Sequence, residues 1–230
     1  MGFNMDAAAG AGPNDLLVAL RAESEEVMAV AHRVLDDALS RKATRSGGLD
    51  APDPKTAGSA AAVADANIVV LSVPGEHAFV EAMEALELGR HVMIFSDNVP
   101  IEQEIILKRY GADHDLLVMG PDCGTAIVNG VGLGFANAVQ PGSVSLVGAS
   151  GTGIQQMCAL LDDAGVGVRH ALGTGSHDLS EDVGAVSTLQ ALEALEEDPA
   201  TELIVVISKP PAEAVAAKVQ AAAAVCTKPV

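Results

Sequence analysis

The run Gly148-Ala149-Ser150-Gly151-Thr152-Gly153 has the residue types of an anion-binding loop. It follows an apolar segment, SVSLV, and opens a helical pattern, GIQQMCALLDDAG. Glycine lets the backbone turn around an anion, hydroxyl groups donate hydrogen bonds, and a helix N-terminus carries about half a positive charge. The spacing matches neither a Walker A loop nor GxGxxG, and an ordinary capped glycine turn would share it. We predict anion binding by Gly148, Ser150, Gly151 and Thr152.

A second group of reactive residue types is Gly120-Pro121-Asp122-Cys123, directly after a predicted strand. Gly-Pro forces a turn, so Asp122 is a candidate acid or base and Cys123 a candidate nucleophile. No histidine lies nearby in sequence to activate the thiol, so the alternative for Cys123 is a packing role.

A third loop, residues 173–178, brings Gly175, Ser176, His177 and Asp178 together. A hydroxyl, an imidazole and a carboxylate in one flexible loop offer acid–base chemistry, and we add Gly175 and Ser176 to the anion-binding set. A solvated turn would have the same composition.

Metal chemistry is not expected. The histidines show no HxH or HxxxH spacing, and the three cysteines show no CxxC spacing. An odd number of cysteines without such spacing also indicates a reducing compartment rather than a disulfide framework.

These loops need strands and helices to position them, and from residue 58 the pattern alternates between the two. Short apolar strands separated by longer helices predict an α/β fold with parallel sheets. The expected strands are 68–73, 91–95, 116–119, 143–147, 168–172 and 202–207, and the expected helices are 59–66, 76–88, 101–110, 151–164, one within 179–197, and 212–224. We expect residues 120–134 to form a glycine-rich loop.

The N-terminal part is expected to contain a flexible tail over residues 1–12, a strand over 15–20, a helix over 24–39 and a long loop over 41–57. At the other end, the chain stops at Lys228-Pro229-Val230, where a further strand should begin. We therefore expect the sequence to be truncated at its C-terminal end.

Composition narrows the range of partners. The net charge is −18, so nucleic acid and anionic membranes are disfavoured. Aromatic residues make up 2% of the chain and tryptophan is absent, which argues against base-stacking surfaces. With no apolar run of about 18 residues and no signal peptide, we expect a cytoplasmic protein that binds a small-molecule anion.

Three segments resemble the α subunit of succinyl-CoA synthetase and its NDP-forming acyl-CoA synthetase relatives: VPGEHAFVEAMEALELGRHVMIFSDNVP, VMGPDCGTAIVNG and VSLVGASGTGIQQM. Within the superfamily, five motifs are similar to the FdrA branch: FSDNVP, LLVMGPDCGT, FANAVQPG, VGASGTGIQ and ISKPPAEAV. The resemblance implies a Rossmann-like CoA-binding-type domain over residues 13–139 and a flavodoxin-like ligase domain over residues 140–230. It also implies homo- or hetero-oligomers with a partner subunit.

The resemblance further implies roles for the loops. The turns that would line a CoA site contain Val73, Pro74, Gly75, Ser96, Asp97, Asn98 and Pro100. Gly120 and Pro121 would lie with Asp122 and Cys123 near the reacting centre, and Ser150, Gly151 and Thr152 would hold a phosphoryl group.

Three departures from the synthetase pattern affect these roles. The first predicted strand runs into Arg21-Ala22-Glu23-Ser24 instead of a glycine-rich phosphate loop, which argues against CoA binding. The synthetases carry a glutamate that supports their phosphohistidine. In the matching neighbourhood this sequence has Ser208 and Lys209, and a lysine there favours binding an anion. The phosphohistidine segment would lie beyond Val230.

The resemblance implies an acyl-CoA synthetase subunit with CoA as a cofactor, against which the first departure argues. It also implies phosphate or an acyl phosphate as a ligand, with Ser150, Thr152 and Lys209 stabilising the anion. One alternative is a carbamoyltransferase subunit that uses carbamoyl phosphate and acts on oxamate or a related ureido acid. Another is a scaffold or regulatory subunit without turnover, because fold alone does not determine function.

Overall fold

The computed structural model describes residues 10, 12, 16–40 and 54–230, and these divide into two units. Unit 1 is Met1–Pro52 and unit 2 is Asp53–Val230. Each unit is described by itself below.

Unit 1 contains one described helix, α1 (Glu25–Ser40). Ser24 caps it, because its Oγ accepts the Val27 N–H at 3.3 Å and its carbonyl accepts the Met28 N–H at 3.0 Å. The expected strand is wrong for residues 16–20, which form neither helix nor strand, and Leu16 is 72% exposed. A strand needs a neighbour to accept its backbone hydrogen bonds. Asp15 and most of the expected tail (1–9, 11) and loop (41–53) lie outside the described residues.

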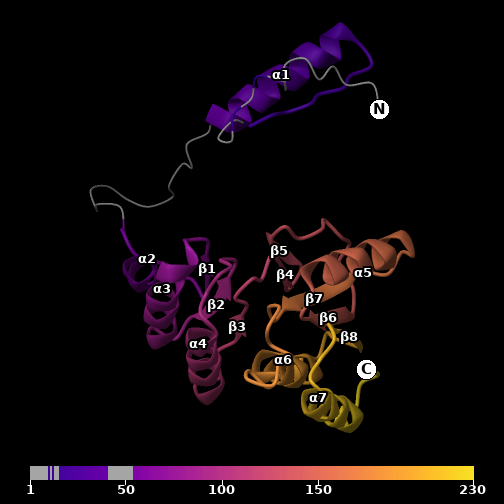
Figure 1. The fold of residues 1–230 in the computed structure, drawn as a ribbon. Coiled ribbons are helices and arrows are strands. Elements are labelled where there is room, and N and C mark those ends of the chain that lie inside the picture. The colour runs from indigo at the N-terminus through magenta and orange to yellow at the C-terminus, as the bar shows by residue number, and fades with distance from the viewer. Residues whose placement is uncertain (1–9, 11, 13–15, 41–53) are drawn as a thin grey trace. The chain divides into compact units, whose positions relative to one another are not determined.

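Unit 2 begins with a three-stranded parallel sheet. Its elements are α2 (Ala57–Val63), β1 (Ile68–Leu71), α3 (Gly75–Glu87), β2 (His91–Ile94), α4 (Ile101–Asp113) and β3 (Val118–Met119). The strand order is β1-β2-β3, with Ile68 opposite His91 and Val92 opposite Val118. The apolar runs predicted all three strands, and in the sheet the strands lie in chain order (Figure 1). The carboxyl ends of β1 and β2 therefore present the turns at 72–75 and 95–100 on one edge.

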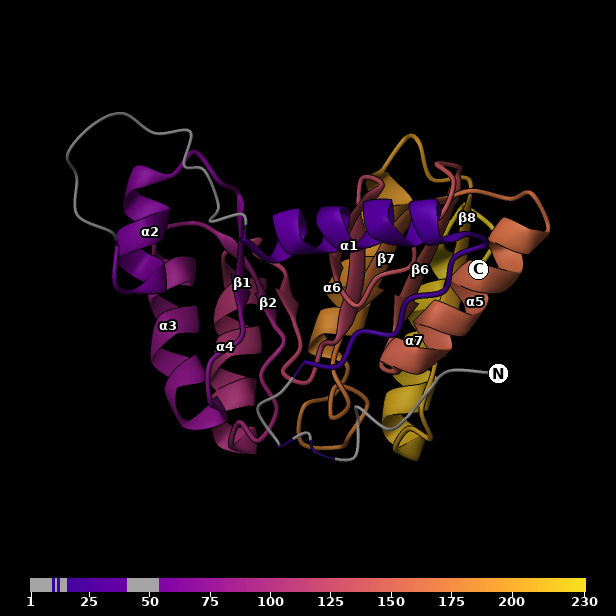
Figure 2. The same ribbon diagram turned by 90° about the horizontal axis from the view of Figure 1, so that it is seen from above.

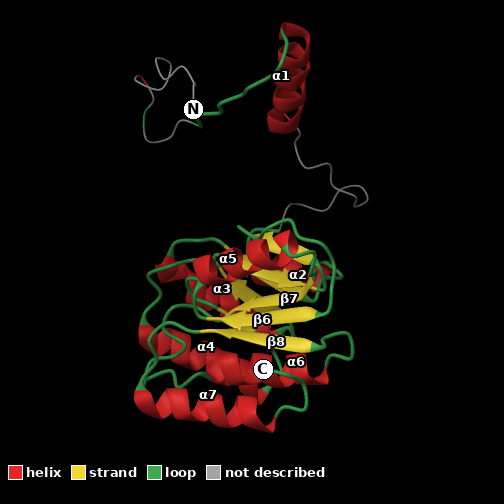
Figure 3. Ribbon diagram, turned by 90° about the vertical axis from the view of Figure 1, so that its right-hand side faces the viewer, coloured by secondary structure: helices red, strands yellow, loops and turns green. Residues whose placement is uncertain are grey.

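The second sheet of unit 2 has five strands in the order β5-β4-β7-β6-β8. Its parallel part consists of β6 (Val144–Gly148), β7 (Val168–Gly173) and β8 (Leu203–Ile207), and its helices are α5 (Gly151–Asp163), α6 (Val186–Glu197) and α7 (Glu213–Val225). Helix α5 lies on one face of this sheet, and α6 and α7 lie on the other (Figure 3). The α/β fold class predicted from the sequence is confirmed.

The prediction of a glycine-rich loop over residues 120–134 is wrong for residues 125–134. That segment forms a hairpin of β4 (Thr125–Val128) and β5 (Val131–Gly134), and β4 also pairs antiparallel with β7. The turn is Asn129-Gly130, with φ of 51° and 76°, the conformation that a two-residue hairpin turn requires. The second sheet is therefore mixed rather than wholly parallel.

A shared core joins the two sheets of unit 2. Met93 of β2 and Met119 of β3 pack in one buried cluster with Val147, Leu172 and Ile204 of the second sheet. Figure 2 shows α3 and α4 beside the first sheet and α5 and α7 beside the second. This common core fixes the loops at the ends of both sheets relative to each other.

A buried ionic cluster ties α4 to the second sheet. The Lys108 ammonium lies 2.9 Å from Glu104 Oε1 and 2.8 Å from Asp178 Oδ1, and it donates to the Thr174 carbonyl at 2.8 Å. Both side chains of the Lys108–Asp178 pair are completely buried. Among the described residues, no helix combines the length and apolar character needed to span a bilayer.

Candidate functional site

Two adjoining cavities lie where loops from both sheets of unit 2 meet, and they share Asp122, Gly124 and Phe135. The larger, of about 400 Å³, is lined by Ser72, Val73, Phe95, Ser96, Asp97, Asp122, Gly124 and Phe135. The smaller, of about 260 Å³, is lined by Asp122, Gly124, Thr125, Phe135, Ala149, Ser150, Gly151, Thr152, Gln155 and Lys209. The predicted CoA turns and the predicted anion loop are thus neighbours.

The smaller cavity is built on the N-terminus of α5. Ser150 caps the helix, because its Oγ accepts the Gly153 N–H at 3.2 Å, and it lies 3.3 Å from the Thr152 hydroxyl. The N–H groups of Gly151 and Thr152 belong to the first helical turn, so they have no acceptor within the helix. The exposed Lys209 side chain, which follows β8, lines the same cavity. Backbone donors, a helix terminus and a cation therefore face one space.

The larger cavity is built on the turns after β1 and β2, which Ser96 holds together. Its Oγ accepts the Val73 N–H at 3.1 Å and its carbonyl accepts the Asp122 N–H at 2.9 Å. Gly75 packs so closely on the carbonyl of Asp97 that a side chain at 75 would overlap it. Gly75 therefore supports the cavity wall rather than lining the cavity.

The wall common to both cavities is pinned at Phe135. Its N–H donates to the Gly124 carbonyl at 2.8 Å, and its carbonyl accepts Gln155 Nε2 at 3.1 Å. Gln155 also donates to Thr125 Oγ1 at 2.8 Å. Phe135 is 70% exposed, and its ring packs edge-on against Phe95, with ring centroids 5.1 Å apart.

The structure assigns different roles to Asp122 and Cys123. Asp122 is exposed and lines both cavities, whereas Cys123 is 2% exposed and lines neither. Burial raises the pKa of the Cys123 thiol to about 12, and its Sγ lies 3.6 Å from the Thr125 carbonyl oxygen. The nucleophile hypothesis for Cys123 is therefore not supported, because the thiolate is the reactive form, and the packing alternative fits the geometry.

The loop after β7 places Asp178 in a structural position, whereas His177 beside it is exposed. Asp178 is fully buried and accepts hydrogen bonds from the Ser187 and Thr188 N–H groups at 3.1 and 2.9 Å. His177 Nδ1 lies 3.2 Å from Glu104 Oε2. Gly175, whose φ is 88°, packs against the carbonyl of Pro121. This loop therefore packs against the turn that carries Asp122.

Several other predicted residues lie outside both cavities. They are Pro74, Asn98, Pro100, Gly120, Pro121, Gly148 and Ser176. Gly148 instead packs against Ile207 of β8 and lines a third cavity.

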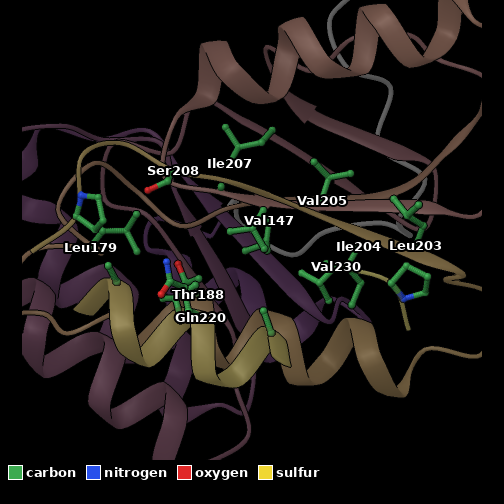
Figure 4. Close-up of a pocket in the computed structure, with 17 residues that line it drawn as sticks. Val147, Leu179, Thr188, Leu203, Ile204, Val205, Ile207, Ser208, Gln220 and Val230 are labelled. Atoms are coloured by element: carbon green, nitrogen blue, oxygen red, sulfur yellow. The ribbon is translucent and has the colours of Figure 1, made fainter. Parts of the chain in front are cut away.

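That third cavity, of about 580 Å³, lies between β8 and α7 and is mainly apolar (Figure 4). Val205 and Ile207 contribute from β8, and Thr188 and Gln220 are among its few polar side chains. No charged side chain is among its lining residues.

Sequence reasoning missed seven residues that line the two adjoining cavities: Ser72, Phe95, Gly124, Thr125, Phe135, Ala149 and Gln155. The sequence signal that could have indicated this wall is the aromatic residue Phe135. The chain has only four phenylalanines, and Phe135 directly follows a glycine-rich hairpin.

Two families match the chain. The one described as "CoA binding domain" matches residues 139–230, and the one described as "AllF, heavy metal-associated domain" matches residues 1–56. The first match covers the second sheet, whereas the resemblance placed the CoA-binding-type domain at 13–139, so that domain assignment stays a prediction. Residues 1–56 do not fit a heavy-metal site, because they contain no cysteine and one histidine, His32.

Two relatives are similar to the chain over more than half of its length. The chain is 50% identical to YahF of Escherichia coli (strain K12), over 73% of the chain and 33% of YahF. It is 27% identical to the succinate–CoA ligase [ADP-forming] subunit alpha of Methanothermobacter thermautotrophicus, over 63% of the chain and 49% of that subunit. The chain therefore spans about a third to a half of these relatives.

A solved structure shows the same fold. The ATP citrate lyase of Methanothrix soehngenii, in complex with citrate and coenzyme A, matches with a TM-score of 0.55 and 22% identity, over 64% of the chain and 26% of the lyase chain. The sequence relatives and the first family match support the superfamily of succinyl-CoA synthetase α subunits and NDP-forming acyl-CoA synthetases, and the solved structure shows the fold.

Proposed function

We propose that the chain is part of an FdrA-type, CoA-ligase-like subunit that holds a phosphoryl or carboxylate anion at the N-terminus of α5. The observation that supports this most directly is the pair of adjoining cavities. Val73, Ser96 and Asp97 line one of them and Ser150, Gly151 and Thr152 line the other. A CoA thiol held on one side would therefore meet an activated acid held on the other.

Charge supports an anion in the smaller cavity. In a chain with net charge −18, Lys209 is the cationic residue among those that line this cavity. It faces the same space as the α5 N-terminus. Hydrogen-bond donors and a cation aimed at one position stabilise the negative charge that develops during acyl or phosphoryl transfer.

Asp122 is the group placed to move a proton. Its exposed side chain lines both cavities, so its carboxylate stands at the junction where the two ligands would meet. There it can accept a proton from an attacking thiol or amine. The Asp122 N–H donates to the Ser96 carbonyl at 2.9 Å, which fixes the position of this turn.

The test is a thermal-shift series with inorganic phosphate, CoA, carbamoyl phosphate and oxamate. A ligand at about 100 times its Kd stabilises the folded state by about 2.7 kcal/mol. For a chain of this size that raises Tm by roughly 5–10 °C. Stabilisation by phosphate and by CoA is the expected result, and no response to any of the four ligands would contradict the proposal.

A carbamoyltransferase subunit is the second candidate, and the N-terminal part favours it. Residues 15–24 contain no glycine, so this segment lacks the glycine-rich phosphate loop expected of a CoA site. The carboxylates of Asp97 and Asp122 in the larger cavity could accept hydrogen bonds from a carbamoyl or oxamate amide. A response to carbamoyl phosphate and oxamate without one to CoA would select this candidate.

A further inference from the structure

Strand β5 forms one edge of the second sheet, and part of its backbone has no partner. Among the described strands it pairs with β4 alone. Val128 lies opposite Val131 across the two-residue turn, so the N–H and carbonyl groups of Val131 and Leu133 point toward β4. Those of Gly132 point away from the sheet, and no described residue bonds to them. The exposed Gly132 therefore presents one donor and one acceptor at the edge.

Two devices that commonly protect an edge strand are missing from β5. Many proteins place lysine or proline on such an edge, which prevents it from pairing with a second chain. The strand and its flanks read Gly130-Val131-Gly132-Leu133-Gly134-Phe135, without charge or proline. Val131 is 62% exposed and Phe135 is 70% exposed. The edge is therefore apolar and open to pairing.

The surroundings of β5 share this lack of charge. Residues 123–161, from the turn before β4 into α5, contain no Asp, Glu, Lys, Arg or His, although 19% of the chain is charged. Helix α5 is tied to the hairpin, because Gln155 donates to Thr125 Oγ1 and to the Phe135 carbonyl. The exposed side chains on this part of α5 are all neutral: Thr152, Gln156 and Leu160.

The charge of the rest of the chain indicates which partner this neutral surface fits. The chain has 31 acidic and 13 basic residues, so a basic partner would be attracted by surfaces that carry the acidic side chains. A second copy has the same net charge of −18 and is repelled by those side chains. It can approach closely only where charge is absent. The surface around β5 therefore fits a second copy better than a basic partner.

We infer that β5 is a homodimer interface, in which the β5 strands of two copies pair antiparallel about a two-fold axis through Gly132. In this register the two Gly132 residues exchange two N–H···O=C hydrogen bonds. Val131 of each copy lies opposite Leu133 of the other, on one face of the joined sheet, where the two apolar side chains meet. This assigns a surface and an occupant to the oligomer that the resemblance implies, and it does not rest on the proposed anion site.

The mass of the chain in solution is the first test. Sedimentation equilibrium is run up to millimolar concentrations of the wild-type chain, at low and at high salt. We expect a dimer that tightens from about 0.1 M to about 1 M NaCl, because the screening length falls from about 10 to about 3 Å and the two acidic chains repel each other less. A chain that stays monomeric at both salt concentrations overturns the inference.

Gly132→Pro and Gly132→Ala form a matched pair that tests the backbone. Proline removes the outward N–H and leaves the hydrogen bonds to β4 in place, because Gly132 makes none of them. Alanine keeps the N–H but adds a Cβ atom 3.1 Å from Ala136 Cβ, so it reports the effect of crowding alone. Proline should raise the Kd of the dimer by about tenfold or more relative to alanine, since both hydrogen bonds at the axis are lost. Equal Kd values in these two variants contradict the pairing.

Val131→Lys tests the same edge through a side chain and decides the matter if the proline variant unfolds. The lysine would face the apolar Leu133 of the second copy, so the dimer should be lost. Val80→Lys is the control, because it makes the same change in net charge on α3, where Val80 is 58% exposed. This control should dimerise at least as well as the wild type. A Val131→Lys dimer as tight as the control dimer would lie on another surface and would overturn the inference.

Discussion

Lys209 would give the proposed anion site its positive charge, although its side chain is exposed. We expect Lys209→Glu to lower phosphate affinity by roughly tenfold, equivalent to about 1.4 kcal/mol, because an attraction becomes a repulsion. The loss should shrink as salt is raised from 0.1 to 1 M, since the screening length falls from about 10 to about 3 Å. Lys218→Glu on α7 makes the same change in net charge away from both cavities. Equal phosphate affinities in the two variants would remove Lys209 from the site.

Ser150 caps α5 and also lines the proposed anion site, and two substitutions separate these roles. Ser150→Ala removes the cap on the Gly153 N–H and should lower the free energy of unfolding by about 1 kcal/mol. Ser150→Asp keeps a good cap, so stability should be retained, but its carboxylate should repel phosphate. Chemical denaturation and phosphate titration together check this pattern. An aspartate variant that binds phosphate normally would contradict the anion site.

At the scale of elements, the ionic cluster between α4 and the loop after β7 controls how the two sheets join. Lys108→Met leaves the buried carboxylates of Glu104 and Asp178 without their cation, and should cost about 3–5 kcal/mol of unfolding free energy. Glu104→Gln leaves the Lys108 ammonium paired with the Asp178 carboxylate, so the loss of unfolding free energy should be smaller. Denaturation midpoints of the two variants give the comparison. A Lys108→Met variant as stable as the Glu104→Gln variant would show that the cluster does not hold the joint.

The elements also show what the sequence could and could not predict. Apolar runs located every strand of the parallel part, because such runs must be buried on both faces. The hairpin at 125–134 was missed although Asn129-Gly130 is a strong turn signal, since four other glycines between 120 and 134 suggested a loop. The strand predicted over 15–20 failed for Leu16–Leu20 because an apolar run does not guarantee a pairing partner.

The candidate site was predictable only where a motif was local. The anion-binding loop at 150–152 was predicted from a strand, a glycine run and a helix that follow each other directly in the sequence. The position of Phe135 depends on its contact with Gly124, 11 positions away. The buried position of Asp178 depends on its contact with Lys108, 70 positions away. Contacts over such separations are fixed by tertiary packing, which a single sequence does not display.

At the scale of the whole molecule, two histidines should make stability fall in mild acid. Burial is the main cause that lowers the pKa of His91 and of His170 below 6.5, and at His170 the nearby Asp198 opposes the effect. In both, Nδ1 accepts a backbone N–H, from Leu117 at 2.9 Å and from Asn129 at 3.1 Å, so protonation there would break the bond. Between the unfolded and folded pKa values the unfolded chain binds more protons. Their contribution is therefore complete above pH 6.5 and is lost as the pH falls below it.

The measurement is the free energy of unfolding at pH 7 and pH 5 for the wild-type chain and for a His91→Asn, His170→Asn double variant. Asparagine can still accept the backbone N–H through its side-chain oxygen but does not titrate in this range. Acidification also reduces the repulsion within a chain of net charge −18, which acts in the opposite direction, but it does so in both proteins. The difference between the two pH responses therefore isolates the histidines. We expect the wild type to lose more stability than the double variant on going from pH 7 to pH 5, and equal responses would show that burial of these rings does not govern the pH dependence of folding.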